Sequence, residues 1–280
     1  MADESGTEET SAATGQVTAT AAEIYESFFV PALFDQWPTR LLDAANPSRD
    51  DRILDVGCGT GILARTAAER LAAGVSAAPD DAVHGLDPNE GMLAVAAQSG
   101  AAVTWDHGTA EALPYPDDSF DHVLSQFALM FFTDQVGALS EMRRVLRPEG
   151  SLTVATWAGL DHTPGYGAMI ELLDRLFGQD AADALRAPFT LGAEADLRPL
   201  LTRSFPDATI TMVDGTARFA SIEAWVHTDV RGWTLADMID DDQYRELLDA
   251  ATVELGRFVD EDGQVRFAAP ALIVTAGGTP

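Results

Sequence analysis

The stretch ILDVGCGTGILA, residues 53–64, determines how the fold of this chain is interpreted. It begins with a short apolar run that contains one acid, Asp55, and it continues with glycines at positions 57, 59 and 61. A short apolar run that ends in glycine predicts a buried strand. The residues after the last glycine predict a helix, whose first N–H groups are free to bind a ligand beyond the end of the strand.

The order of these residues distinguishes between the ligands that a glycine turn can hold. Glycine permits positive φ angles and lets a ligand approach the backbone closely. Dinucleotide-binding turns have the spacing G-x-G-x-x-G, whereas this turn has G-x-G-x-G with Asp55 before it. A carboxylate repels a pyrophosphate and attracts an ammonium or sulfonium group, so Asp55 favours a cationic ligand. The alternative is that Asp55 only accepts hydrogen bonds from the amides of the turn.

Apolar strand patterns and helical patterns alternate after this unit. Four further strands are predicted within residues 82–87, 101–108, 120–132 and 149–157, with helices between most of them. Strands that alternate with helices predict βαβ units and a parallel sheet, and right-handed crossovers place helices on both of its faces. The predicted fold class is therefore α/β, in a Rossmann-like, doubly wound arrangement that binds ligands beyond the carboxyl ends of its strands.

A second acid follows the second predicted strand. Asp87 is succeeded by Pro88 and a helical pattern. An acid in this position accepts hydrogen bonds from both hydroxyls of a ribose. It can also cap the helix, with proline at the first helical position. The two roles are compatible with each other.

The pattern changes on both sides of this core. We predict a disordered acidic tail over residues 1–19, and N-terminal helices with the ligand-binding core over 20–157. A helical cap with one or two strands is predicted over 158–262, and a final core strand with a tail over 263–280. The first segment has almost nothing to bury, and the cap is long enough to determine substrate choice.

The amino-acid composition limits the partners and the cellular environment that are expected for this chain. The net charge is −28 and the chain contains no lysine, which predicts a halophilic protein whose acidic surface is screened by salt. An ordinary acidic protein is the alternative. The same charge argues against a nucleic acid partner. Cys58 is the only cysteine, so no disulfide within the chain is expected, and neither a signal peptide nor a membrane span is predicted. The expected location is the cytoplasm.

Four motifs resemble a known family in their order and spacing. They are residues 53–61 (ILDVGCGTG), 85–96 (GLDPNEGMLAVA), 108–126 (GTAEALPYPDDSFDHVLSQ) and 141–157 (EMRRVLRPEGSLTVATW). They resemble the class I S-adenosylmethionine-dependent methyltransferases, in the branch that includes the ubiquinone and menaquinone methyltransferases. The resemblance implies a mostly parallel, seven-stranded sheet with one antiparallel strand near the C-terminus. It also implies S-adenosylmethionine as the cofactor, with S-adenosylhomocysteine as its product.

The resemblance further implies roles for individual residues. Asp55 helps to hold the amino end of the cofactor, and Asp87 binds its ribose hydroxyls. Thr109 occupies the place of an aspartate that usually accepts from the adenine amino group, so Thr109 or the nearby Glu111 takes that role. The backbone N–H of Ala110 is a further adenine contact. The remaining cofactor-binding candidates are Gly57, Cys58, Gly59, Thr60, Gly61, Pro88, Met92, Ser125 and Gln126.

These roles predict a methyltransferase for a small-molecule acceptor that is apolar or aromatic. Methyl transfer needs a positioned nucleophile and the exclusion of water more than it needs a general base. No catalytic residue is therefore assigned; Gln126, Tyr25 and His162 are the candidates, and no metal is expected. The alternatives are a cofactor-binding regulator without activity and another transferase on the same fold. A homodimer is a further expectation about partners.

The region after the core adds weaker candidates for acceptor binding. His227 and Arg231 share one face of a predicted helix, where they meet either an acidic substrate or only solvent. Aromatic residues that include Trp157, Tyr166 and Trp233 are expected in the core. Where some of them line a pocket instead, the acceptor is apolar or aromatic.

Overall fold

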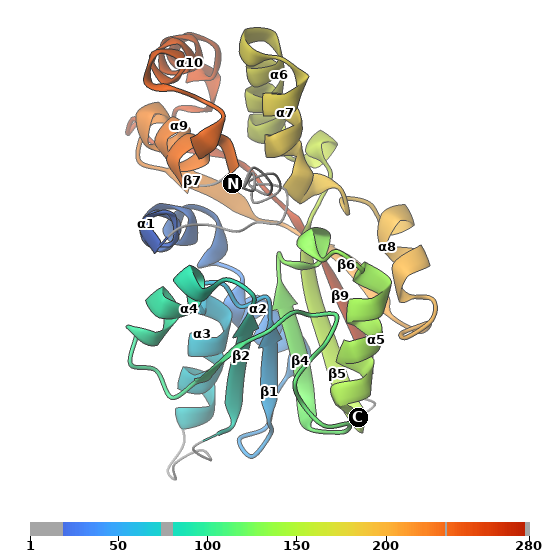
Figure 1. The fold of residues 1–280 in the computed structure, drawn as a ribbon. Coiled ribbons are helices and arrows are strands. Elements are labelled where there is room, and N and C mark those ends of the chain that lie inside the picture. Colours follow the sequence, from blue (N-terminus) through green and yellow to red (C-terminus); the bar gives the residue numbers. More distant parts are fainter. Residues whose placement is uncertain (1–18, 74–80, 233, 278–280) are drawn as a thin grey trace, which may run out of the picture.

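The structure is a computed structural model that describes residues 19–73, 81–232 and 234–277 (Figure 1). The predicted tail lies outside the described residues except at Ala19, and Trp233 also lies outside them. The apolar run before the glycines forms β1 (Ile53–Val56), which is buried along its whole length. Parallel pairing with a strand on each side places β1 inside the sheet.

Seven strands form one sheet in the order β3-β2-β1-β4-β5-β9-β6. The first five in this order are parallel to their neighbours, while β9 is antiparallel to both β5 and β6. The predicted mostly parallel sheet with one antiparallel strand near the C-terminus is confirmed. Strand order reverses at β1 and β4, which is where open α/β sheets bind ligands. The other strands are β2 (Val83–Asp87), β3 (Thr104–His107), β4 (Phe120–Gln126), β5 (Leu146–Trp157), β6 (Thr209–Val213) and β9 (Ala271–Gly277).

Helices cover both faces of this sheet, as predicted (Figure 1). On one face α2 and α3 pack against each other, and on the other face α5 packs against α8. Gly61 is the N-cap of α3, so this helix begins directly at the end of the glycine turn. These helices, with α4, are α2 (Pro38–Ala45), α3 (Ile62–Ala72), α4 (Glu90–Ala97), α5 (Gln135–Val145) and α8 (Glu194–Leu201).

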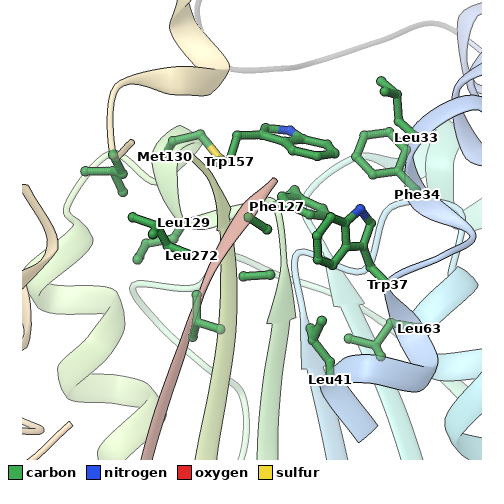
Figure 2. Close-up of a cluster of buried hydrophobic side chains, with 14 of the residues drawn as sticks. Leu33, Phe34, Trp37, Leu41, Leu63, Phe127, Leu129, Met130, Trp157 and Leu272 are labelled. Carbon is green, nitrogen blue, oxygen red and sulfur yellow. The ribbon is translucent and has the colours of Figure 1, made fainter. Parts of the chain in front are cut away.

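The N-terminal helices lie between the sheet and the upper layer of the molecule (Figure 1). The short helix α1 (Ala19–Ile24) continues into a π-helix, η2 (Tyr25–Phe34). A π-helix is rare and often occurs at functional sites. Its last residue, Phe34, contacts the rings of Phe127 and Trp157. Those two rings are stacked with their centroids 3.8 Å apart, and they join η2 to the ends of β4 and β5 (Figure 2).

A second layer of helices and a two-stranded sheet lie above the carboxyl ends of the strands (Figure 1). The predicted domain division stays a prediction. Within the 158–262 segment β6 joins the main sheet, while β8, which follows residue 262, pairs with β7 in the small sheet. None of the helices in the described ranges is long and apolar enough to cross a membrane. This layer contains α6 (Pro164–Phe177), α7 (Gln179–Arg186), α9 (Ile222–Arg231), α10 (Asp241–Glu254), β7 (Thr216–Phe219) and β8 (Val265–Ala268).

Candidate active site

The glycine turn is packed too tightly for side chains at two of its positions. Gly57 has a φ of +72°, and a Cβ atom there would lie 2.5 Å from the Cβ atom of Ala128, on the loop after β4. Gly61 has a φ of +85°, and a Cβ atom there would overlap the ring of Trp105. Both backbone conformations favour glycine. The turn therefore lies directly against the β4 loop, and Trp105 covers Gly61.

Asp55 is buried near the end of β1, with one carboxylate oxygen bonded and the other not. Its Oδ2 atom accepts a hydrogen bond of 3.1 Å from the N–H of Ala64 on α3. Its Oδ1 atom is buried and has no hydrogen-bond partner among the described residues. Burial, reinforced by the nearby Asp87, raises the pKa of Asp55 to about 8. One oxygen thus braces the first turn of α3, while the other faces a space that a donor group can enter.

Asp87 lies at the end of β2, beside the glycine turn. Its Oδ2 atom accepts from the N–H of Gly59 at 2.8 Å, and its Oδ1 atom accepts from the N–H of Asn89 at 2.8 Å. The N-cap of α4 is Asn89, whose side chain accepts from the N–H of Met92. The prediction that Asp87 caps this helix is therefore wrong, while its ribose contact stays a prediction. Burial raises the pKa of Asp87.

A cavity with about 830 Å³ of empty space lies at the carboxyl ends of β1, β2 and β4, and we call it the turn cavity. Two of its lining atoms, Thr60 Oγ1 and Gln126 Oε1, are buried without a hydrogen-bond partner among the described residues. Gln126 ends β4, and Phe127 after it has a φ of +55°, a strained conformation for an aromatic residue. Strain of this kind is typical of functional sites. The lining is Tyr25, Asp55, Gly57, Cys58, Gly59, Thr60, Ile62, Leu63, Asp87, Pro88, Asn89, Met92, Gln126, Phe127, Ala128, Phe131 and Phe132.

A second cavity, with about 550 Å³ of empty space, adjoins the first, and we call it the aromatic chamber. Tyr25, Phe127 and Phe131 line both spaces. Among the described residues that line it, all are aromatic or aliphatic except Asp229, on α9. The aromatic chamber is lined by Tyr25, Phe29, Leu33, Phe34, Phe127, Phe131, Trp157, Tyr166, Leu185, Pro188, Phe189 and Asp229.

Known proteins resemble this chain over the part that forms the turn cavity. Residues 54–154 match a family model described as a methyltransferase domain. A demethylmenaquinone methyltransferase from Geobacillus kaustophilus is 38% identical over 124 residues, which are 42% of this chain and 50% of that protein. A malonyl-[acyl-carrier protein] O-methyltransferase from Erwinia pyrifoliae is 38% identical over 117 residues, which are 42% of this chain and 41% of that protein. The chain thus spans about half the length, or less, of these curated relatives.

Over residues 54–154 the chain therefore has a methyltransferase domain that resembles those of the class I S-adenosylmethionine-dependent methyltransferases, in the ubiquinone and menaquinone methyltransferase branch. Likeness of fold extends further than likeness of sequence. Phosphoethanolamine N-methyltransferase 2 from Haemonchus contortus, solved with S-adenosyl-L-methionine, matches with a TM-score of 0.59 at 18% identity. That match covers 94% of this chain and 58% of the other chain. The methyltransferase fold therefore includes most of the layer above the sheet as well as the core.

The methyltransferase fold brings most of the predicted cofactor residues to the turn cavity. Burial raises the pKa of Cys58, so its thiol stays protonated, as suits a small turn residue rather than a nucleophile. Gly61 does not line the cavity, because Trp105 covers it. The predicted residues that do line it are Tyr25, Asp55, Gly57, Cys58, Gly59, Thr60, Asp87, Pro88, Met92 and Gln126.

Two predicted residues lie away from both cavities. Ser125 is fully buried and donates a hydrogen bond of 2.8 Å to the carbonyl oxygen of Val56, so it faces β1. His162 has a side chain that is 46% exposed and lies 3.4 Å from Asp161, beside a separate surface pocket. Neither side chain lines the turn cavity or the aromatic chamber. The contact of Ser125 with the methionine part and the catalytic role of His162 stay predictions. Consecutive strand residues point to opposite sides, so Gln126 and Ser125 do not both face the cavity.

The predicted adenine contacts are also displaced. The Oε1 atom of Glu111 accepts hydrogen bonds from the N–H groups of Thr133 at 2.8 Å and Asp134 at 3.3 Å. Glu111 therefore holds the loop before α5 through this oxygen, and its role in place of the family aspartate stays a prediction. Thr109 is exposed and Ala110 is buried, and neither lines the turn cavity.

The sequence patterns did not identify Asp229 as a residue of the site, although they predicted His227 and Arg231 on the same helix as candidates for acceptor binding. Arg231 forms an ion pair of 2.5 Å with Asp241, and the ring of His227 packs against Phe28 with centroids 5.3 Å apart. Neither residue lines the aromatic chamber. The available signal is spacing: Asp229 follows the buried Trp225 by four residues, which places an acid on the apolar face of α9.

Proposed function

We propose that this chain transfers a methyl group from S-adenosylmethionine to a small-molecule acceptor with an apolar or aromatic body. The observation that carries the proposal is the pair of adjoining cavities, one with unsatisfied polar atoms and one with aromatic walls. A transferase with two substrates needs two spaces that meet where the groups react. Here the shared residues Tyr25, Phe127 and Phe131 mark that junction.

The residues of the turn cavity fit the chemistry of the cofactor. S-adenosylmethionine supplies a reactive methyl group on a sulfonium, and its amino acid part carries an ammonium and a carboxylate. The unpartnered Oδ1 atom of Asp55 suits the ammonium, and the unpartnered hydroxyl of Thr60 suits the carboxylate. Asp87 lines the same cavity, which supports the contact with the ribose hydroxyls that the family resemblance implies. Buried polar atoms are rarely left unbonded in proteins, which supports a polar ligand in this cavity.

The residues around the junction contribute position and the exclusion of water. The aromatic walls hold an apolar body and keep water away from the reacting groups, and positioning alone supplies roughly 7–11 kcal/mol in well-oriented reactions. Burial and the neighbouring acids raise the pKa of the Tyr25 hydroxyl, so it acts as a hydrogen-bond donor rather than a base. The unpartnered Oε1 atom of Gln126 is the acceptor that can orient a nucleophile bearing a proton. The names of two relatives, a demethylmenaquinone methyltransferase and a malonyl-[acyl-carrier protein] O-methyltransferase, support a small acceptor group, either free or attached to a carrier protein.

The proposal is tested first by cofactor binding. Calorimetric titration in concentrated KCl should show binding of S-adenosylhomocysteine and no binding of NAD. The reverse result would remove the proposed cofactor. Turnover against a panel of phenols, quinols, acids and amines then separates an enzyme from a regulator that only binds the cofactor.

Asp87 provides the matching substitution. Asp87→Ala should weaken S-adenosylhomocysteine binding by roughly tenfold or more, because a charge-assisted hydrogen bond contributes about 1.5–3 kcal/mol. The control is Asp106→Asn, since Asp106 pairs with His84 and Tyr115 and does not line the turn cavity. Equal affinities for Asp87→Ala and the unaltered protein would contradict the ribose role.

We also propose a cytoplasmic location, a homodimer and the absence of a nucleic acid partner. The net charge of −28 supports the last of these, because phosphate contacts need basic groups. Size-exclusion chromatography with light scattering at several salt concentrations tests the dimer. A monomer at every concentration of protein and salt would contradict it.

A further inference from the structure

Asp229 enters the aromatic chamber from α9 and is not fully bonded there. Its side chain is 1% exposed, and it lines the chamber. Its Oδ1 atom accepts a long hydrogen bond of 3.4 Å from the hydroxyl of Tyr166. Its Oδ2 atom is buried without a hydrogen-bond partner among the described residues. The indole N–H of Trp225, four residues earlier on α9, lies close enough to this carboxyl to lower its pKa, but neither it nor the Oδ2 atom makes a hydrogen bond of acceptable geometry within the described residues. The chamber therefore contains an acceptor atom whose bonding is incomplete.

No cation of the described residues compensates this acid. Arg231, two residues further along α9, forms its ion pair with Asp241 instead. Burial raises the pKa of Asp229 to about 8, and the hydroxyl of Tyr166 and the side chain of Trp225 offset only part of that rise. Without a cation nearby, the carboxyl is mostly protonated at neutral pH, and a positively charged ligand would favour its ionised form. A titratable group that is kept in a cavity under these conditions is a candidate for ligand binding.

We propose that Asp229 binds a protonated amine of the methyl acceptor, at a position other than the atom that receives the methyl group. The inference rests on the proposed methyltransferase function and adds a substrate class to it: an apolar or aromatic body that carries a cationic amine. The two positions differ because Asp229 does not line the turn cavity. In addition, an ammonium held by a carboxylate keeps its lone pair protonated and is not a nucleophile.

The walls around Asp229 favour an ammonium over a hydroxyl. Aromatic faces attract cations, and Tyr166, Phe189 and Trp157 line the same chamber as the acid. A hydroxyl can form a hydrogen bond with the Oδ2 atom, whereas an ammonium also forms an ion pair with the carboxylate and so favours its ionised form. The net charge of −28 also favours the approach of a cation over that of an anion.

The test compares three probes on the full-length protein, with S-adenosylhomocysteine bound, in concentrated KCl. 2-Naphthylmethylammonium, 2-naphthylmethanol and 2-ethylnaphthalene share one aromatic body and nearly one size, and they differ in charge and hydrogen bonding. Equilibrium dialysis gives the Kd of each probe. The unaltered protein should bind the ammonium about 30-fold more tightly than the ethyl compound, with the alcohol between them.

Substitution then assigns the preference to one residue. Asp229→Asn keeps the shape of the side chain and removes its charge, so the preference for the ammonium should fall to within about threefold of the other probes. Glu223→Gln is the matched control, because it removes one charge from an exposed position of the same helix and should keep the preference. An equal loss of affinity for all three probes in Asp229→Asn would mean that Asp229 only maintains the shape of the chamber.

Other outcomes overturn the inference directly. Equal binding of the three probes by the unaltered protein contradicts it, as does tighter binding of the alcohol than of the ammonium. This series needs no substitution, so it decides the matter even where Asp229→Asn fails to fold. If S-adenosylhomocysteine itself does not bind, the proposed function fails. If it binds and the ammonium has no advantage, only the inference about Asp229 fails.

Discussion

Replacing Asp229 by asparagine should stabilise the protein, and the gain should grow with pH. Burial raises the pKa of Asp229 from an ordinary value of 3.8 to about 8. That rise corresponds to a difference of roughly 6 kcal/mol between the protonated and ionised forms. The folded protein holds the proton of Asp229 more tightly than the unfolded chain does. The stability that this group contributes is therefore fully present below about pH 4 and is lost as the pH rises to about 8. Asparagine does not titrate, so Asp229→Asn avoids the loss.

The expected magnitude follows from the same relation. Between about pH 5 and about pH 8, the free energy of unfolding of Asp229→Asn should rise relative to the unaltered protein by about 3–4 kcal/mol. The assay is urea unfolding in concentrated KCl, followed by tryptophan fluorescence, at several pH values. Asp55 also has a pKa of about 8, but it is present in both proteins and its contribution cancels in the comparison. Tyr25 and Tyr166 share the chamber with Asp229 and stay protonated throughout this range.

A constant difference between the two proteins across this range would refute the reasoning. It would mean that Asp229 titrates as a solvated carboxyl and that water enters the aromatic chamber. Glu223→Gln on the same helix is the control, because it removes one carboxylate from an exposed position.

Three further predictions concern the glycine turn and the surface. Thr60→Val removes a buried hydroxyl without a partner among the described residues. The free energy of unfolding, measured in urea, should therefore rise by about 1 kcal/mol, while S-adenosylhomocysteine should bind less tightly. A loss of stability would contradict this. Gly57→Ala should lower the free energy of unfolding by about 1–3 kcal/mol more than Gly100→Ala does. Both glycines have positive φ, but only at Gly57 would a Cβ atom overlap a neighbour, Ala128. Equal losses of stability would contradict this contact. Raising the KCl concentration should raise the thermal unfolding midpoint, because salt screens the net charge of −28, and a flat response would contradict the halophilic prediction.

The parts of the site that the sequence predicted are those fixed by short-range rules. Asp55 and Asp87 each follow or end an apolar run, so their places at the carboxyl ends of β1 and β2 follow from the chain pattern alone. The glycines at 57 and 61 are likewise local, since a positive φ favours this residue. These positions need no knowledge of how distant segments pack.

The sequence is less informative where tertiary contacts decide the outcome. Ser125 and Gln126 belong to one motif, but the pleat of β4 turns one toward β1 and the other toward the cavity. The motif predicts that Glu111 can accept from the adenine amino group, whereas in the fold one of its oxygens accepts a hydrogen bond from the backbone before α5. Asp229 is buried where α9 packs against α10 and against η2. The η2 segment precedes α9 by about 200 residues along the chain. Neither composition nor periodicity reports such contacts.

Asp55 and Asp229 are in the same physical situation in two adjoining cavities. Each is buried, each has one oxygen without a partner among the described residues, and burial raises the pKa of each to about 8. A ligand that binds only the folded protein stabilises it by an amount set by its concentration relative to its Kd, so a cation bound in either cavity would offset the cost of the acid there. The three shared residues Tyr25, Phe127 and Phe131 then lie between two positive groups, and their ring faces attract both. Under the two proposals made above, the aromatic junction would separate a cationic cofactor from a cationic acceptor, so that their charges would not be in direct contact.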